Sequence, residues 1–296
     1  MPDICLWNKC NNRCIMCTNS EEFSNSNSVG NYDLKTQIKK FEMFLNGKKV
    51  FKGGSGYNSY INITGGEPTI HPCFFELIGY IRKRAPDMPI TLLTNARMFS
   101  KIAFTQKFIK LAKLPFTVAI NFPSYKKSTF EKITNIKGSY KETLKGIDNL
   151  FKIFNGRIEF RIVIHKLNIY ELKKTVEFLL KRYKNYYNFY IVIIHYEIEG
   201  MSDINNKLIE LKIKDSAKYI NNNLKYLIKK SNVEIRLYHY PLCLLNKDLR
   251  KHAWITLPSY DRIYTKKCKR CSLRDKCLGL MKSYYKRYND YEIKPL

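Results

Sequence analysis

The sequence predicts an α/β fold in which an incomplete barrel is followed by a small module rich in cysteine. The first observation is an alternation, because six short apolar runs are separated by segments with helical periodicity. Strands that alternate with helices favour parallel pairing and right-handed crossovers. The second observation is a change near the C-terminus, where the periodicity fades and four of the 9 cysteines gather.

The six predicted strands are rich in β-branched and aromatic residues, and their near-continuous apolar character is typical of strands buried on both faces. They span residues 3–8, 60–63, 90–94, 116–121, 158–164 and 189–195. Between them, apolar residues spaced three or four apart predict helices. These helices cover residues 34–45 behind an Asp33 cap, 74–84, 101–113, 140–154 and 170–183. Together the six units predict a partial (β/α)6 barrel of the TIM type.

The chain beyond the sixth strand predicts two further parts. Residues 203–231 have the amphipathic spacing of one long helix, and VEIRLYHY at 233–240 is typical of a strand. We therefore expect a core over residues 1–202, a connecting helix over 203–231 and a small module over 232–296.

Charge and composition narrow the function classes. The 53 basic and 25 acidic residues give a formal charge of +28, which favours polyanion binding and makes nucleic acid an alternative partner. Basic residues are scattered along the whole chain, however, and Lys, Asn, Ile and Tyr are abundant together, as codon bias in an AT-rich genome produces. No run approaches the roughly 18 apolar residues of a membrane span, and no secretory signal is visible at the N-terminus. We expect a soluble cytoplasmic protein whose cysteines bind metal or do redox chemistry.

The first cysteine motif follows the first predicted strand. Cys10, Cys14 and Cys17 form C-x3-C-x2-C in the run CNNRCIMC. Thiolates are the soft ligands of iron-sulfur clusters, and three of them leave one iron of a [4Fe-4S] cluster open to a small molecule. A zinc site completed by a distant ligand, or unligated core cysteines, are the alternatives.

A second motif follows the second predicted strand. Gly65, Gly66, Glu67 and Pro68 lie in the run TGGEPT. The carboxyl ends of parallel strands share one rim, so we expect this motif to meet the cysteine motif. The glycines permit close backbone approach, the carboxylate can accept from an ammonium group, and the proline stiffens the turn.

The two motifs together, within a six-fold β/α pattern, resemble the radical S-adenosylmethionine (radical SAM) superfamily over residues 1 to about 200. The resemblance implies that the cysteine triplet binds a reducing [4Fe-4S] cluster and that the GGEP motif contacts the methionyl amino group of SAM. It further implies that an electron from the cluster splits SAM, and that the resulting 5′-deoxyadenosyl radical abstracts a hydrogen atom from the substrate. In such enzymes the cofactor does the difficult chemistry while the protein orients and shields it.

Two further residues match the family less sharply. Asn95, in the run LLTNA, corresponds to the family's third-strand ending, near the SAM ribose or the substrate; ordinary turn chemistry is the alternative. Arg161 lies in the fifth predicted strand, where related enzymes often place a cation for the SAM carboxylate. An unpaired charge in a buried strand is costly, which favours a partner for this arginine.

The C-terminal cysteines form a separate motif. Cys268, Cys271 and Cys277 form C-x2-C-x5-C, and Cys243 lies upstream. After a radical SAM core this arrangement resembles the Twitch or shortened SPASM extension, which carries an auxiliary [4Fe-4S] cluster; a zinc knob is the alternative. If all four cysteines bind, the auxiliary cluster has no open iron, and electron transfer or structural support remains.

We therefore predict a radical SAM oxidoreductase that acts on a peptide or protein side chain by oxidation, crosslinking or epimerisation. RNA, a nucleotide, a sugar or another small molecule is the alternative substrate. A zinc-dependent nucleic-acid-binding protein without catalysis is the alternative from another class. The radical SAM prediction also implies an external electron donor such as flavodoxin or ferredoxin.

Overall fold

The computed structural model describes residues 3–25, 32–47 and 60–296. The chain forms two compact units. The first unit comprises residues 1–14, 19–121 and 134–159, and the second comprises residues 15–18, 122–133 and 160–296.

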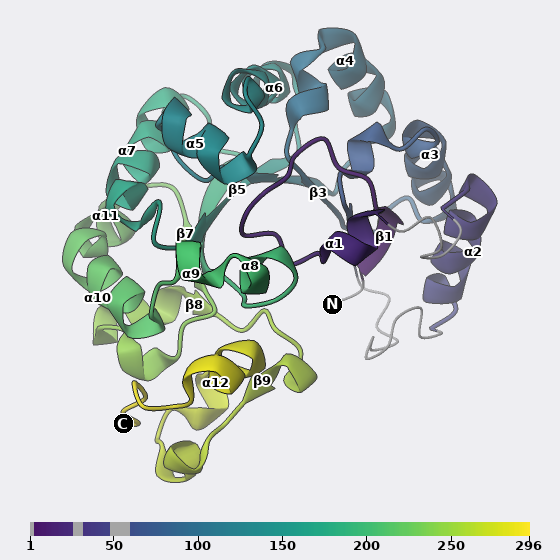
Figure 1. Cartoon of the computed structure of the whole chain (residues 1–296). Coiled ribbons are helices and arrows are strands. Elements are labelled where there is room, and N and C mark those ends of the chain that lie inside the picture. Colours follow the sequence, from purple (N-terminus) through teal and green to yellow (C-terminus); the bar gives the residue numbers. More distant parts are fainter. Residues whose placement is uncertain (1–2, 26–31, 48–59) are drawn as a thin grey trace. The chain divides into compact units, whose positions relative to one another are not determined.

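Parallel strands and outer helices build the first unit. Its strands β1 (Asp3–Trp7), β2 (Ile61–Gly65), β3 (Ile90–Thr94) and β4 (Phe116–Asn121) pair in this order, and all three pairings are parallel. The outer layer consists of α2 (Leu34–Leu45), α3 (Phe74–Arg84), α4 (Ile102–Leu111) and α6 (Ser139–Ile153), in which each helix packs against the next (Figure 1). The Asp33 side chain accepts from the Thr36 amide at 2.7 Å and caps α2, as its position before the apolar run predicts. A short helix, α1 (Glu21–Asn25), follows the first cysteine motif.

The second unit continues the same pattern. Strand β5 (Arg157–Ile164) begins in the first unit and ends in the second, where β6 (Phe189–His195), β7 (Ile235–Tyr238) and β8 (Ala253–Trp254) pair in parallel. The strand order of the whole sheet is β1 to β8, the order along the chain. Helix α5 (Lys127–Thr134) follows β4, and α7 (Leu172–Arg182) connects β5 with β6. Every residue of β6 is buried, as expected for a strand covered on both faces.

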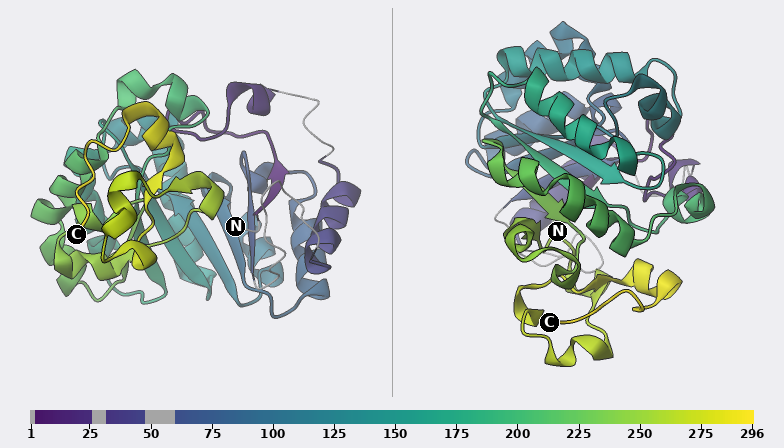
Figure 2. Two further views of the ribbon diagram at one scale, coloured as in Figure 1. Left: turned by 90° about the horizontal axis from the view of Figure 1, so that it is seen from below. Right: turned by 90° about the vertical axis from the view of Figure 1, so that its left-hand side faces the viewer.

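Short elements make up the C-terminal part of the second unit. Strands β9 (Arg262–Ile263) and β10 (Leu280–Met281) pair antiparallel, and α12 (Lys282–Tyr288) follows. Between β7 and β10 lie five 3-10 helices: Leu242–Leu244, Lys247–His252, Ser259–Asp261, Lys266–Arg270 and Arg274–Lys276. Figure 2 shows this part in yellow-green to yellow, with turns in place of long elements.

The fold confirms the predicted α/β class and all six predicted strands, and it corrects one detail. Residues 201–230 form four short helices, α8 (Met201–Ile204), α9 (Asn206–Ile209), α10 (Ile213–Asn223) and α11 (Lys225–Lys230), where we expected one long helix. The apolar positions Ile209, Ile213, Ile220 and Ile228 are buried, whereas Ile204 and Leu208 are exposed, so only part of the apolar spacing marks a buried face. Strand β7 lies within residues 233–240, where the sequence predicts a strand, and it pairs with β6 and β8.

Within the described ranges, none of the helices combines the length and the apolar character that crossing a bilayer requires.

Candidate active site

The first three cysteines lie in an irregular segment between β1 and α1. Cys10 is exposed, whereas Cys14 and Cys17 are half-buried. Their spacing limits the distance between neighbouring Cα atoms to about 14 Å or less, because an extended residue spans at most about 3.6 Å. The three thiols thus lie outside any helix or strand.

Backbone hydrogen bonds hold this segment on both sides of Cys14. In the first unit, the Arg13 amide donates to the Thr134 carbonyl at 3.0 Å, and in the second unit the Ile15 amide donates to Ile133 at 3.0 Å. The carbonyl of Cys17 accepts from the Ser202 amide at 3.0 Å within the second unit. The loop that carries the thiols therefore has a defined path although it lacks regular structure.

The GGEP motif meets the chain just before Cys10, as predicted from the shared rim. The Gly66 amide donates to the Trp7 carbonyl at 2.5 Å, and the Glu67 amide donates to the Lys9 carbonyl at 2.8 Å. A Cβ atom added to Gly65 would collide with the Trp7 carbonyl, and one added to Gly66 would collide with that of Lys9. Gly65 also has a φ of 138°, a conformation that side chains disfavour. The glycines are required because two backbones touch here.

We expect Gly66→Ala to destabilise the protein by at least about 1 kcal/mol, because the new methyl group must displace a backbone carbonyl. Gly79→Ala is the matched control. Its Cβ would meet only the Leu111 side chain, at 3.6 Å, inside α3, so it should leave stability unchanged or raise it by about 0.5–1 kcal/mol. Urea unfolding of both variants checks this. Equal unfolding midpoints for the two variants would contradict the close-approach role of Gly66.

The Glu67 carboxylate is buried and ties the ends of β2 and β3 together. Oε1 accepts from the Thr69 amide at 3.1 Å, the Thr69 hydroxyl at 2.5 Å and the Thr94 hydroxyl at 2.6 Å, while Oε2 accepts from the Asn95 amide at 2.7 Å. Burial raises the pKa of this carboxyl, and these hydrogen bonds oppose the rise. The side chain expected to meet an ammonium group is thus occupied by four donors of the protein. Pro68, next in the chain, is buried and opens a short 3-10 helix that Glu67 caps.

Asn95 also lies beside the first cysteine segment. Its Nδ2 donates to Oδ1 of Asn11, between Cys10 and Cys14, at 2.6 Å, and its Oδ1 accepts from the Arg97 amide at 3.0 Å. The structure thus places Asn95 next to the predicted cluster loop, together with Gly65, Gly66 and Glu67.

Arg97 is a site residue that sequence reasoning missed. Its guanidinium donates to the Asn11 carbonyl, to Oδ1 of Asn12 at 3.0 Å and, through Nε, to Oε2 of Glu142 at 2.6 Å. A single cation therefore clamps the backbone between the first two cysteines. The available signal was an arginine two residues after Asn95 at the same strand ending, but nothing local connects it with residue 11.

Arg161 lies in β5 of the second unit and is half-buried. Its positive charge lowers the pKa of Glu197, although burial still leaves that pKa raised, at about 7. It also contributes to the lowered pKa of His239, which burial brings to about 4. The buried-strand cation predicted from sequence therefore has acidic and aromatic neighbours within its electrostatic reach.

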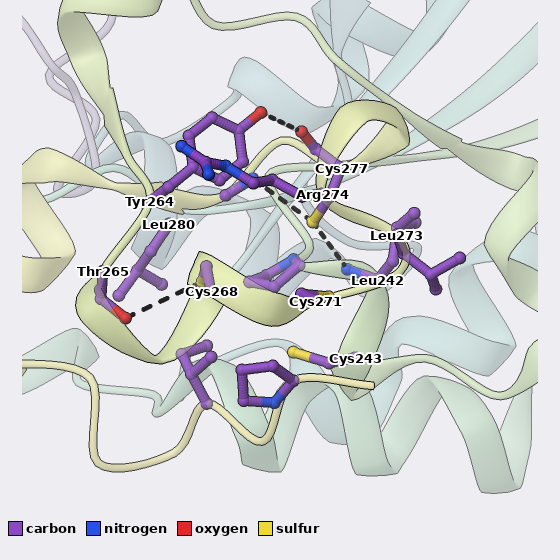
Figure 3. A pocket seen from close by; sticks show the side chains of 14 residues that line it. Leu242, Cys243, Tyr264, Thr265, Cys268, Cys271, Leu273, Arg274, Cys277 and Leu280 are labelled. Atoms are coloured by element: carbon purple, nitrogen blue, oxygen red, sulfur yellow. Dashed lines mark hydrogen bonds between the residues drawn. The ribbon is translucent and has the colours of Figure 1, made fainter.

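The four C-terminal cysteines line one pocket of the second unit. Cys243, Cys268, Cys271 and Cys277 surround it, with an apolar wall from residues such as Leu273, Leu280 and Ile293 (Figure 3). The pocket has about 400 Å³ of empty volume, part of it open to solvent. Three of these cysteines end tight turns. The amides of Cys268, Cys271 and Cys277 each donate to the carbonyl three residues earlier.

Hydrogen bonds to sulfur mark Cys277 and Cys268. The amides of Leu242 and Gly279 both donate to Sγ of Cys277 at 3.4 Å, and the Thr265 hydroxyl lies 3.8 Å from Sγ of Cys268. Burial raises the pKa of the Cys243 thiol to about 11, and the nearby Cys277 and Cys268 add to the rise. The Cys243 thiol would lose its proton readily only with a bound cation, because metal ligation requires and stabilises the thiolate.

In the described part of the chain, no three His, Cys, Asp or Glu side chains are placed to hold a single metal ion. The four cysteines nevertheless share one pocket.

The chain is similar to curated proteins and to solved structures. The chain is 26% identical over 182 residues to the GTP 3′,8-cyclase of Petrotoga mobilis, covering 60% of this chain and 51% of that one. A second GTP 3′,8-cyclase, from a Sulfurovum species, is 26% identical over 217 residues, or 72% of this chain and 61% of that one. The chain thus spans little more than half the length of these curated relatives.

Among solved structures, SuiB of Streptococcus suis bound to its precursor peptide SuiA superimposes with a TM-score of 0.59 at 12% identity, over 79% of this chain and 48% of SuiB. HydG, a maturase of the [FeFe]-hydrogenase, gives a TM-score of 0.55 at 13% identity, over 81% of this chain and 52% of HydG. At these identities the likeness concerns the fold. Residues 4–179 match the family model of the Radical SAM superfamily, more than half of the chain, and the protein belongs to that superfamily.

Proposed function

We propose that the protein cleaves SAM reductively and removes a hydrogen atom from its substrate. The observation that carries this proposal is the contact between the two motifs, in which the GGEP backbone binds Trp7 and Lys9 directly before Cys10. Asn95 and Arg97 then hold Asn11 and Asn12 inside the triplet. The side chains of Asn95 and Arg97 thus fix the loop that carries the thiols.

The donor set fits a [4Fe-4S] cluster, because Cys10, Cys14 and Cys17 supply three soft thiolates and leave one iron for SAM. When bound, the cluster and SAM supply the 5′-deoxyadenosyl radical that takes hydrogen from the substrate. The protein's own part is to hold the loop and to present polar groups. Since four donors occupy the Glu67 carboxylate, backbone carbonyls of the GGEP turn are the acceptors that we assign to the SAM amino group. Asn95 and Arg161 remain our candidates for the ribose and the carboxylate.

We propose a second, auxiliary [4Fe-4S] cluster on Cys243, Cys268, Cys271 and Cys277. The shared pocket and the amide donors to Cys277 support it, since hydrogen bonds to sulfur tune such clusters. Four cysteine ligands leave no open iron, so the substrate would bind elsewhere. The auxiliary cluster would then accept an electron from the substrate radical or support the fold. Zinc is the alternative, and iron, sulfide and zinc analysis of anaerobically purified protein separates the two.

For the substrate we propose a peptide or protein side chain, which the fold shared with peptide-bound SuiB supports. A nucleotide is the second candidate, because both matching curated relatives are GTP 3′,8-cyclases. The basic charge of +28 is compatible with a triphosphate or with RNA. An external reductant such as flavodoxin or ferredoxin and a cytoplasmic location complete the proposal.

The test combines anaerobic protein, dithionite and SAM with either GTP or a peptide encoded beside the gene. Incubation in deuterium oxide, or with substrate deuterated at exchange-resistant carbons, followed by mass spectrometry of 5′-deoxyadenosine, identifies the donor of the hydrogen. Deuterium transfer from the labelled peptide supports the first candidate, and transfer from labelled GTP supports the second. No SAM consumption by reduced protein with intact clusters would refute the proposal.

A further inference from the structure

Two hydrogen-bond acceptors face each other in the second unit, beyond the carboxyl ends of β6 and β7. Nδ1 of His239 lies 2.9 Å from the carbonyl oxygen of His195, and Nε2 of the same ring lies 3.8 Å from Oε1 of Glu197. A carbonyl only accepts, so Nδ1 carries the proton and donates. In a neutral imidazole Nε2 is then an acceptor, and it faces a carboxylate.

His239 is neutral at physiological pH. Its side chain is 5% exposed, and burial lowers its pKa to about 4, with a further contribution from the Arg161 charge. The 3.8 Å separation also exceeds a hydrogen bond, so a proton on either group would not join the two. In the described part of the chain the two groups are therefore acceptors that no hydrogen bond joins to each other.

The separation suits one bridging donor. A nitrogen placed about 2.9 Å from both acceptors can direct one N–H to each, which an NH2 group does and a single N–H does not. Glu197 is 29% exposed, so its carboxylate can be reached by a ligand. His239 has a φ of 71°, a strained conformation for a residue other than glycine, and such strain is kept mainly at functional positions.

The charges around the pair favour a neutral donor. Arg161 of β5 lies within electrostatic reach of both Glu197 and His239, where it stabilises the Glu197 carboxylate and disfavours a positive charge at His239. An ammonium group would add a second positive charge beside the guanidinium. An amide or a ring amino group brings the two N–H donors without that repulsion.

We propose that Glu197 and His239 form a substrate-binding site that accepts both hydrogen bonds of a neutral NH2 group, either a carboxamide or an amino group on a heteroaromatic ring. The inference rests on the proposed function only in that the bound group belongs to the substrate. Glu197 binds the substrate, and His195 acts as a positioning residue because its carbonyl fixes the His239 tautomer.

Binding should weaken in acid. The groups that act on Glu197 are Arg161 of β5, His239 after β7, Asp261 of the 3-10 helix Ser259–Asp261 and Glu199 in its own segment. Burial raises the pKa of Glu197 to about 7, with Asp261 adding to the rise and Arg161 opposing it. Above this pKa the carboxylate accepts; below it, the carboxyl is protonated. Affinity should then fall about tenfold for each pH unit below the pKa.

Two matched probe pairs test the site in the cluster-loaded protein. Benzamide and N,N-dimethylbenzamide differ in the NH2 group, and GTP and ITP differ in the ring amino group. Infrared difference spectra report the Glu197 carboxylate, and titrations give the affinities at pH 8.5 and pH 6. We expect the probe with NH2 to bind about 10- to 100-fold more tightly in at least one pair at pH 8.5, and to shift the carboxylate band.

Two variants and one control make the assignment specific. Glu197→Gln should remove the NH2 preference and its pH dependence. His239→Asn should weaken the preference while its amide keeps the donation to His195 and tolerates the positive φ. Glu199→Gln, with the same charge change in the same segment, should keep the preference. Circular dichroism and iron content verify folding of each variant.

The outcomes separate the two sources of the donor. A preference for GTP over ITP assigns a ring amino group, and a preference confined to benzamide assigns a carboxamide, as in a peptide. Equal binding within both pairs, or a preference that survives in both folded variants, overturns the site. SAM cleavage by the wild-type protein is measured separately, so its failure would refute the proposed function and leave the NH2 preference as an independent result.

Discussion

Replacing Cys10, Cys14 and Cys17 together with alanine should lower reductive SAM cleavage by more than about 1000-fold, to the level of the reductant alone. The three thiols are the ligands that we assign to the cluster that binds SAM, and no other cysteine lies within the loop held by Arg97 and Asn95. The measurement is 5′-deoxyadenosine formed by anaerobic, dithionite-reduced protein, together with iron and sulfide per chain. About four irons should remain, bound by the C-terminal cysteines.

Cys73→Ala is the matched control, since Cys73 is half-buried and belongs to neither cysteine motif. It should keep both SAM cleavage and the full iron content. Retained cleavage in the folded triple variant would remove the cluster assignment, and with it the proposed reaction.

Cys268→Ala should have the second largest effect, on the C-terminal site. Loss of one of four thiolates opens the auxiliary cluster, and we expect iron to fall from about eight to about four per chain. The variant should still form 5′-deoxyadenosine, because the first three cysteines are intact, while product formation from substrate falls to background. Iron analysis, electron paramagnetic resonance and product analysis measure the three quantities.

Cys271→Ala should repeat this result, because its thiol lines the same pocket. If the wild-type protein contains one zinc ion per chain, and neither variant loses iron relative to it, the four cysteines form a zinc site. If both variants lose helical signal, the site contributes to the stability of the second unit, which contains β7 and the cysteine-lined pocket.

The predicted elements agree closely with the structure because strands and helices follow from local patterning. Residues 90–94 and 116–121 were predicted as strands and form β3 and β4, and residues 74–84 form α3. The long helix expected over 203–231 is divided into four in the structure. The sequence did not predict this division, because apolar spacing carries no information about where the backbone hydrogen bonds of a helix break.

The candidate site was predicted in part. The spacing of Cys10, Cys14 and Cys17 and the run GGEP pointed to one rim, and the contacts of Gly66 and Glu67 with Trp7 and Lys9 agree with it. The sequence predicts that the Glu67 side chain accepts from an ammonium group, whereas in the structure it accepts from four donors of the protein. Its four donors come partly from Thr94 and Asn95, on the next strand, and no local pattern predicts that these would occupy the carboxylate.

By itself the sequence determined the fold class, the two cysteine motifs and the superfamily, because these depend on spacings along a continuous chain. Only the tertiary structure decided that Arg97 clamps Asn11, that Cys243 shares a pocket with cysteines far along the chain, and that His239 turns Nε2 toward Glu197. Such pairs depend on strand register, side-chain rotamers and the protonated nitrogen of a buried ring. These features are set by the packing of distant segments, and composition and periodicity carry no record of them.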